Sequence, residues 1–357
     1  MLPSSHRVVN EEPALPTALP SDIAALLRRG FVIPAHPLAL DARRRLNPRR
    51  QRALARYYLD AGSGGLAVGV HATQFAIREA GLYEPVLRLA AEEAANRKVV
   101  LIAGLSGKTS QAKREAQLAR ALGYHCGMLS LGAMKGSGVD ELVDHCAAVA
   151  AEIPLVGFYL QAAVGGIPLP MEFWRRFAAI ENVVAIKIAP FNRYATLDVV
   201  RGVVAARAED RIALYTGNDD HIVLDLAVPF DIPRDGRSVR VRIRGGLLGH
   251  WSVWTKTAVS LLKRIHDGQI DADLLALDAR VTDCNSAFFD VANNFAGCIP
   301  GCHEVLRRQG LLEGTWCLDP QEKLSPGQAQ EIDRVYREHA DLTDDAFVRA
   351  NLERWLT

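Results

Sequence analysis

Short apolar runs alternate with amphipathic stretches along most of this chain. From residue 30 onward, runs rich in β-branched and small apolar residues predict strands. The stretches between them place apolar residues at helical spacing, as in residues 48–61, 83–97, 110–122 and 139–151, and predict helices. The predicted strands are residues 30–34, 65–70, 99–105, 126–131, 155–160, 183–188, 212–215 and 246–249.

The strand runs are apolar throughout, which is typical of parallel strands buried on both faces. Their alternation with helices indicates βαβ units, and eight units in about 240 residues match the period of a (β/α)8 TIM barrel, an α/β fold. The alternative is a doubly wound sheet. No Gly-x-Gly-x-x-Gly follows the first strand, which argues against that alternative.

The pattern predicts three parts. Residues 1–29 are expected to form an irregular N-terminal arm, since residues 1–20 contain four prolines and no apolar signal-like run. Residues 30–267 form the barrel, with residues 228–244 as an inserted loop or short hairpin. Residues 268–357 form a helical extension packed on the barrel, with helices within residues 271–310 and 325–356.

Composition narrows the class of protein. The net charge is +1 with no basic block, so nucleic acid is not an expected partner. No apolar run approaches the roughly 20 residues of a membrane span, so no membrane partner is expected either. Six cysteines in 357 residues are too dilute for a disulfide scaffold, and a cytoplasmic enzyme is the default expectation.

Lys187 lies inside the apolar run of residues 183–189. Burial disfavours the charged ammonium, so a lysine there loses its proton more readily and becomes an amine nucleophile for a carbonyl substrate. The alternative is a strand-end lysine that extends its head to water or pairs with a carboxylate. Lys135 is a rival nucleophile, but the glycines around it predict an exposed loop.

In a barrel, the residues at the carboxyl ends of the strands face the active site. Three of them are histidines, His36, His71 and His250, and together with Asp219 they suggest a divalent metal site as an alternative. Their isolated spacing favours polar substrate contacts instead, and we expect no metal and no other cofactor. The full set of strand-end candidates is His36, His71, Ser106, Tyr159, Lys187, Asn218, Asp219 and His250.

Several segments resemble the dihydrodipicolinate synthase and N-acetylneuraminate lyase superfamily of class I aldolases. Residues 153–159 (IPLVGFY) end in Tyr159, and Lys187 follows 28 residues later, as the family's tyrosine and lysine do. Residues 215–219 (YTGND) resemble the family's Gly-x-Asp segment after strand seven. Residues 306–310, 314–318 and 324–328 resemble its closing helices.

The resemblance implies a role for each matching residue. Lys187 would form an imine with the keto carbon of pyruvate or a related 2-keto acid, and Tyr159 would relay protons. Gly217 and Asn218 would line the substrate site. The family also implies a homo-oligomer and a small-molecule 2-keto acid as the only partner.

The chain also departs from the family pattern. The family's Gly-Thr-Thr-Gly-Glu loop, which holds the keto acid's carboxylate, is replaced by residues 69–74 (GVHATQ). We expect His71, with Thr73 or Ser106, to substitute for its hydroxyls, and His36 and His250 to contact substrate. The synthases' arginine after the tyrosine is missing from residues 163–166 (AVGG), so lysine biosynthesis is not expected.

The sequence therefore predicts a Schiff-base lyase acting on a 2-keto acid through Lys187. Two alternatives remain open at this point. One is a dehydratase of a 2-keto-3-deoxy sugar acid that uses the same imine chemistry. The other is a barrel that binds a metabolite without catalysis.

Overall fold

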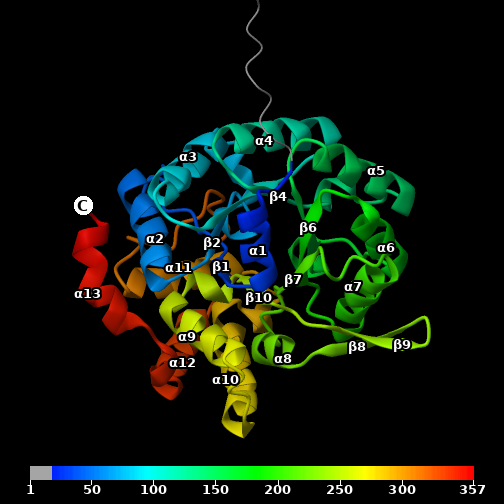
Figure 1. The fold of residues 1–357 in the computed structure, drawn as a ribbon. Helices are drawn as coiled ribbons and strands as arrows, with labels where there is room; N and C mark the ends of the chain where they lie inside the picture. The colour runs from blue at the N-terminus through cyan, green and yellow to red at the C-terminus, as the bar shows by residue number, and fades with distance from the viewer. Residues whose placement is uncertain (1–17) are drawn as a thin grey trace, which may run out of the picture.

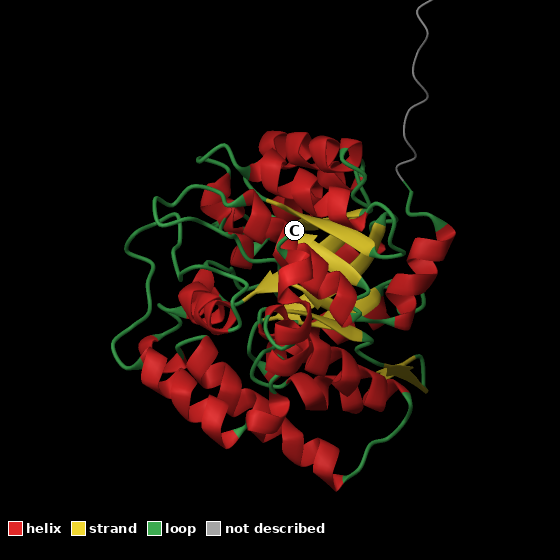
Figure 2. Ribbon diagram, turned by 90° about the vertical axis from the view of Figure 1, so that its left-hand side faces the viewer, coloured by secondary structure: helices red, strands yellow, loops and turns green. Residues whose placement is uncertain are grey.

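The computed structural model describes residues 18–357, and its centre is a closed barrel of parallel strands (Figures 1 and 2). The eight strands follow the order β1-β10-β7-β6-β5-β4-β3-β2. A bridge between Ala35 and Ala67 joins β1 back to β2, so the predicted barrel is confirmed. The strands are β1 (Val32–Pro34), β2 (Gly65–Val68), β3 (Val100–Leu105), β4 (Cys126–Leu129), β5 (Leu155–Leu160), β6 (Val183–Ala189), β7 (Ala213–Thr216) and β10 (Gly245–Leu248).

Helices surround the strands on the outside and continue into a C-terminal extension (Figure 2). Those of the barrel are α2 (Pro48–Ala61), α3 (Tyr83–Ala94), α4 (Thr109–Ala121), α5 (Val139–Ala150), α6 (Met171–Ala179), α7 (Arg193–Ala205), α8 (Ile222–Ala227) and α9 (Thr255–His266). Those of the extension are α10 (Ala272–Phe288), α11 (Cys298–Arg308), α12 (Gln328–Glu338) and α13 (Asp345–Trp355). Short 3-10 turns that matter below are η1 (His71–Thr73), η4 (Ala162–Val164), η5 (His250–Ser252) and η6 (Val291–Asn293).

Successive residues of each strand face opposite sides of the barrel wall. Outward residues such as Ile186 and Ile188 pack with the helices in one large apolar cluster. Inward residues such as Ala185 and Ala189 belong to a second cluster inside the barrel. Because side chains alternate along a strand, Lys187 lies on the inner face between these two alanines.

The N-terminal arm is partly helical, which corrects the expectation of an irregular segment over residues 1–29. Ser21–Arg29 forms α1, and residues 1–17 lie outside the described part of the chain. Ile23 and Leu27, four residues apart on one helix face, enter the inner cluster, and the Tyr215 hydroxyl donates to the Leu27 carbonyl at 2.9 Å. The apolar stripe of α1 therefore closes the amino-terminal end of the barrel, where Figure 1 shows it lying across the strands.

The insertion between β7 and β10 is a helix followed by a hairpin. The strands β8 (Phe230–Arg234) and β9 (Arg237–Val241) pair antiparallel and project from the barrel (Figure 1). The expected loop or short hairpin over residues 228–244 is therefore a hairpin. Over residues 18–357, no helix combines the length and the apolar character needed to cross a membrane.

Candidate active site

Lys187 extends into a cavity at the carboxyl end of the barrel. Its side chain is 7% exposed, and its ammonium nitrogen Nζ lies 4.6 Å from the centre of the Phe158 ring. Gly217 on the neighbouring segment makes room for it, since a Cβ there would lie 2.7 Å from Lys187 Cε. The Lys187 side chain thus lies between the Phe158 ring and Gly217, where the absence of a Cβ leaves room for it.

Most of the cavity wall is apolar. Two of its lining residues, Phe191 and Phe295, contact each other edge to face, with ring centres 5.7 Å apart. The polar lining consists of His71, Gln161 and Asp219 in addition to Lys187. The described lining residues are Ala35, Val70, His71, Ala72, Phe158, Leu160, Gln161, Val164, Lys187, Ala189, Phe191, Gly217, Asp219, Gly249, Phe289, Phe295 and Cys298.

Burial lowers the pKa of Lys187 from its usual 10.5 to about 8, although the nearby Asp219 and Cys298 oppose this shift. No ion pair joins the amine to a carboxylate among the described residues, Asp219 included. At pH 7 a group with a pKa near 8 is about one-tenth free amine, against less than about a thousandth for an ordinary lysine. Lys187 is thus suited to attack a carbonyl carbon.

Asp219 supplies the only carboxylate among the described residues of the cavity wall. It follows β7, is 8% exposed, and its Oδ1 accepts a hydrogen bond from the His250 backbone N–H at 3.1 Å. The side chain of Asn285 donates to the Asp219 carbonyl at 2.6 Å and fixes its backbone. Burial raises the pKa of Asp219 to about 7, with the His250 N–H and then Lys187 acting in the opposite direction.

His71 is the one strand-end histidine whose side chain lines the cavity. It begins η1, and burial followed by the charge of Lys187 lowers the pKa of its imidazole to about 4. At pH 7 the imidazole is neutral, so one of its nitrogens can donate a hydrogen bond and the other can accept one. His71 therefore lines the cavity with a neutral ring, and its contact with a substrate stays a prediction.

Tyr159 does not face Lys187, which corrects the expected pairing of phenol and amine. In the parallel pairing of β5 with β6, Phe158 stands opposite Lys187, and Tyr159 stands opposite Ile188. The Tyr159 ring packs against Trp174 of α6 at 5.3 Å, and its oxygen accepts from the Leu169 N–H at 3.2 Å. Tyr159 is a packed residue of the outer cluster, and a phenyl ring occupies the corresponding inner position.

Thr73 and His36 are also used inside the protein rather than at the cavity. The Thr73 hydroxyl donates to the His36 carbonyl at 2.7 Å and accepts from the Gly69 N–H at 2.9 Å. The His36 ring is fully buried, with Nδ1 within 3.0 Å of the Gln51 side chain, and it packs against Tyr58. Both therefore shape the β1 and β2 loops, contrary to their expected substrate contacts.

Ser106, Asn218 and His250 likewise lie outside the cavity lining of the described chain. Ser106 donates its backbone N–H to Glu115 at 3.0 Å. The Asn218 side chain accepts from the Phe191 N–H and donates to Asp225, which fixes the loop after β6. The His250 ring stacks on Phe288 of α10, and the residue serves the site only through its backbone bond to Asp219.

The C-terminal extension contributes to the cavity, which strand-end reasoning missed. Phe289 and Phe295 come from the segment joining α10 to α11, and Cys298 begins α11; all three line the cavity. The described cysteines are unpaired, and burial raises the pKa of the Cys298 thiol, so it stays protonated. The aromatic residues near this segment are the sequence signal that points to it.

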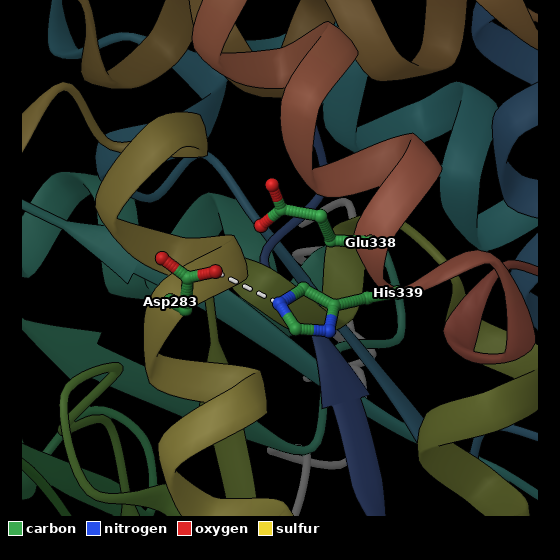
Figure 3. A group of neighbouring side chains, drawn as sticks. All are labelled: Asp283, Glu338 and His339. Atoms are coloured by element: carbon green, nitrogen blue, oxygen red, sulfur yellow. Dashed lines mark hydrogen bonds and ion pairs between the residues drawn. The ribbon is translucent and has the colours of Figure 1, made fainter.

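The histidine metal site finds no support in the geometry. Among residues 18–357, the group of three donors close enough to hold one ion is Asp283, Glu338 and His339, on α10 and α12 (Figure 3). Arg334 forms ion pairs with both of these carboxylates, at 2.8 and 2.7 Å. Arg334, followed by the His339 hydrogen bond, outweighs burial and lowers the pKa of Asp283 to about 2. The group is therefore part of an ion-pair network that joins α10 to α12 through Arg334.

Comparison with known proteins places this geometry in context. The model of the "Dihydrodipicolinate synthetase family" matches residues 30–230. The 4-hydroxy-tetrahydrodipicolinate synthase of Desulforudis audaxviator (strain MP104C) is 28% identical over 240 residues, which cover 66% of this chain and 79% of that protein.

Solved structures share the fold at lower identity. The N-acetylneuraminate lyase from Fusobacterium nucleatum superposes with a TM-score of 0.70 at 16% identity, covering 87% of this chain and 98% of that one. YagE, a prophage protein of the dihydrodipicolinic acid synthase family from E. coli K12 in complex with pyruvate, gives 0.73 at 17% identity, covering 87% and 98%. At these identities the structures are evidence of the fold alone.

Proposed function

This chain belongs to the dihydrodipicolinate synthetase family, and on that premise we propose that it is a Schiff-base lyase acting on pyruvate or a related 2-keto acid. The observation that carries the proposal is Lys187, a buried lysine without an ion pair at the end of a cavity, with its pKa lowered to about 8. In the proposed reaction the amine attacks the keto carbon, and water leaves to give an iminium. The C3–C4 bond then breaks: its electron pair forms the C2–C3 double bond, the C2–N double-bond pair moves to nitrogen, and the C4 hydroxyl gives its proton to a base of the cavity and becomes the carbonyl of the released aldehyde.

The cavity wall favours this reaction over dehydration of a sugar-derived keto acid. A polyhydroxylated chain needs several hydrogen-bond partners, because an unpaired buried hydroxyl costs about 1–3 kcal/mol. The described polar side chains of the wall are His71, Gln161, Lys187 and Asp219, besides the thiol of Cys298, and phenylalanine rings line much of the rest. No arginine is among the described lining residues, so a substrate with a second carboxylate is not favoured either.

A role in binding alone is less well supported than catalysis. A binding protein gains nothing from a buried lysine held without an ion pair, because burial disfavours its charged form. A charged, paired lysine would hold an anionic ligand better. Assembly into a homo-oligomer stays a prediction drawn from the family.

Borohydride trapping tests the proposal directly. The protein is incubated with pyruvate and a panel of 2-keto acids, reduced, digested, and the modified peptide is identified by mass spectrometry. We expect a reduced adduct on Lys187 and none in Lys187→Met. The control Lys135→Met removes an exposed lysine after η3 (Gly132–Met134) and should leave the adduct unchanged.

The outcome separates chemistry from binding. An adduct on Lys187 whose yield depends on the keto acid supports the lyase and ranks its substrates. Folded wild-type protein that yields no adduct with any acid, or an adduct on surface lysines alone, contradicts it.

A further inference from the structure

Imine chemistry requires a group that moves protons near the reacting carbon. The position opposite Lys187 is occupied by Phe158, whose ring has no exchangeable proton. Tyr159 points to the outer helices. The cavity must therefore use one of its other titratable side chains, which among the described lining residues are His71, Asp219 and Cys298.

The placement of Asp219 leaves one oxygen available to a bound molecule. Oδ1 is held by the His250 N–H at 3.1 Å, whereas Oδ2 has no hydrogen-bond partner among the described residues. Gly249 and Phe289, which line the same cavity, lie beside this oxygen: a Cβ on Gly249 would stand 3.8 Å from Oδ2 and 2.9 Å from the Phe289 ring, so these neighbours offer Oδ2 no polar partner. Asp219 and Lys187 face one cavity without an ion pair between them, and a small molecule can lie between acid and amine.

The two competing groups are poorly matched to the task at neutral pH. The imidazole of His71 has a pKa of about 4 because it is buried beside Lys187, so it is a weak base. The buried thiol of Cys298 holds its proton. Burial brings the pKa of the Asp219 carboxyl to about 7, where it exists in both forms and can take up and return a proton.

We propose that Asp219 removes and returns the C3 proton of the keto acid imine on Lys187, a role that rests on the proposed function. The C3–H bond breaks and its proton goes to an Asp219 carboxylate oxygen. The electron pair of that bond forms the C2–C3 double bond, while the C2–N double-bond pair moves to nitrogen and neutralises the iminium. Carbon–carbon cleavage ends in the same enamine, and Asp219 then returns a proton to C3 before the keto acid is released.

Exchange of the pyruvate methyl protons with deuterium isolates this step, because it requires no acceptor substrate. Proton NMR in D2O follows the loss of the methyl signal for wild type, Asp219→Asn and Asp220→Asn. Asp220 is the adjacent, exposed carboxyl, outside the cavity lining of the described chain, and is the matched control. We expect Asp219→Asn to slow exchange by roughly 10²–10⁴-fold and Asp220→Asn to stay within about twofold of wild type.

Borohydride trapping on Lys187 in the same samples reports whether the pocket is intact. A trapped adduct with slow exchange in Asp219→Asn supports the assignment. A trapped adduct with exchange near the wild-type rate overturns it, while the lyase proposal stands. Wild-type protein without an adduct removes the proposed function itself, and this proposal with it.

The pH dependence of exchange gives a second test if Asp219→Asn fails to fold. At saturating pyruvate, where Lys187 is already an imine, wild-type exchange should rise with pH as Asp219 loses its proton. A rate that is flat between pH 5.5 and 8.5 overturns the assignment. The groups that face Asp219 and enter its titration are Lys187 on β6, His71 on η1, His250 on η5, Cys298 and Cys302 on α11, and Asp220 on its own loop.

Discussion

Phe158 and Tyr159 are neighbours on β5, but their side chains lie on opposite sides of the barrel wall. Phe158 presents its face to the Lys187 amine inside the barrel, where it supports a desolvated nitrogen without offering a proton. Tyr159 packs between the strand and α6, where its hydroxyl accepts a backbone N–H. The Tyr159 hydroxyl therefore has a structural role, and its removal should lower stability and leave the chemistry unchanged.

Tyr159→Phe should leave pyruvate trapping and methyl exchange within about twofold of wild type. Its stability should fall by about 0.5–1.5 kcal/mol, because the Leu169 N–H loses its acceptor. Urea denaturation measures the stability change, and the NMR exchange assay measures the chemistry. A 100-fold loss of exchange in a folded variant would return Tyr159 to the reaction.

The sequence predicts the burial of Lys187 correctly and its neighbours in the barrel poorly, for a physical reason. A lysine in an unbroken apolar strand is buried whichever face it occupies, so its altered chemistry follows from the run itself. Assigning Phe158 or Tyr159 to the inner face requires the strand register, which shifts between Leu155 and Val156. A one-residue change in register moves each side chain to the other face.

At the scale of elements, the strands follow the predicted runs closely because continuous apolar stretches have no other way to be buried on both faces. Helix α1 was missed since the proline-rich segment before it suggested irregular structure up to residue 29. Its two apolar anchors, Ile23 and Leu27, form a stripe too short to stand out in a nine-residue helix. The helix is held by the barrel end that it covers.

Leu27→Ala should destabilise the protein by about 2–5 kcal/mol, as expected for a buried leucine, while keto acid trapping on Lys187 persists in the folded fraction. Leu27 is 1% exposed and packs in the inner cluster, at the opposite end of the barrel from the site. The control Leu275→Ala, at a side chain 40% exposed on α10, should cost less than about 1 kcal/mol. Equal losses in the two variants would mean that α1 does not support the barrel.

At the scale of the whole molecule, the fold keeps several imidazoles neutral. Burial lowers the pKa of four histidines from 6.5 to about 4: His36, His71 and His250, which follow the neighbouring strands β1, β2 and β10, and His303 on α11. Between these values the unfolded chain binds protons that the folded chain does not, so the histidine contribution to stability is complete above pH 6.5 and declines toward pH 4. Carboxyls with raised pKa values oppose the trend, namely Asp219, Asp220, Glu322 and Asp344.

We expect the free energy of unfolding to fall as pH is lowered from 6.5 to 4.5, with a smaller slope in His36→Gln. One histidine accounts for at most about 1.4 kcal/mol per pH unit in this window. Urea denaturation at half-unit steps gives both slopes. Identical slopes for the two proteins would show that His36 titrates normally in the folded state.

Because α1 closes the amino-terminal end of the barrel, it also determines the route by which molecules reach and leave the site. The inner cluster and α1 close the amino-terminal end of the barrel within the described chain, so substrate and products must enter and leave at the carboxyl end of the strands. In the proposed lyase, the fragment that is not bonded to Lys187 departs first, and the fragment held as the imine departs last. A nine-residue helix at one end of the molecule thus confines the entry of substrate and the release of both products to the other end.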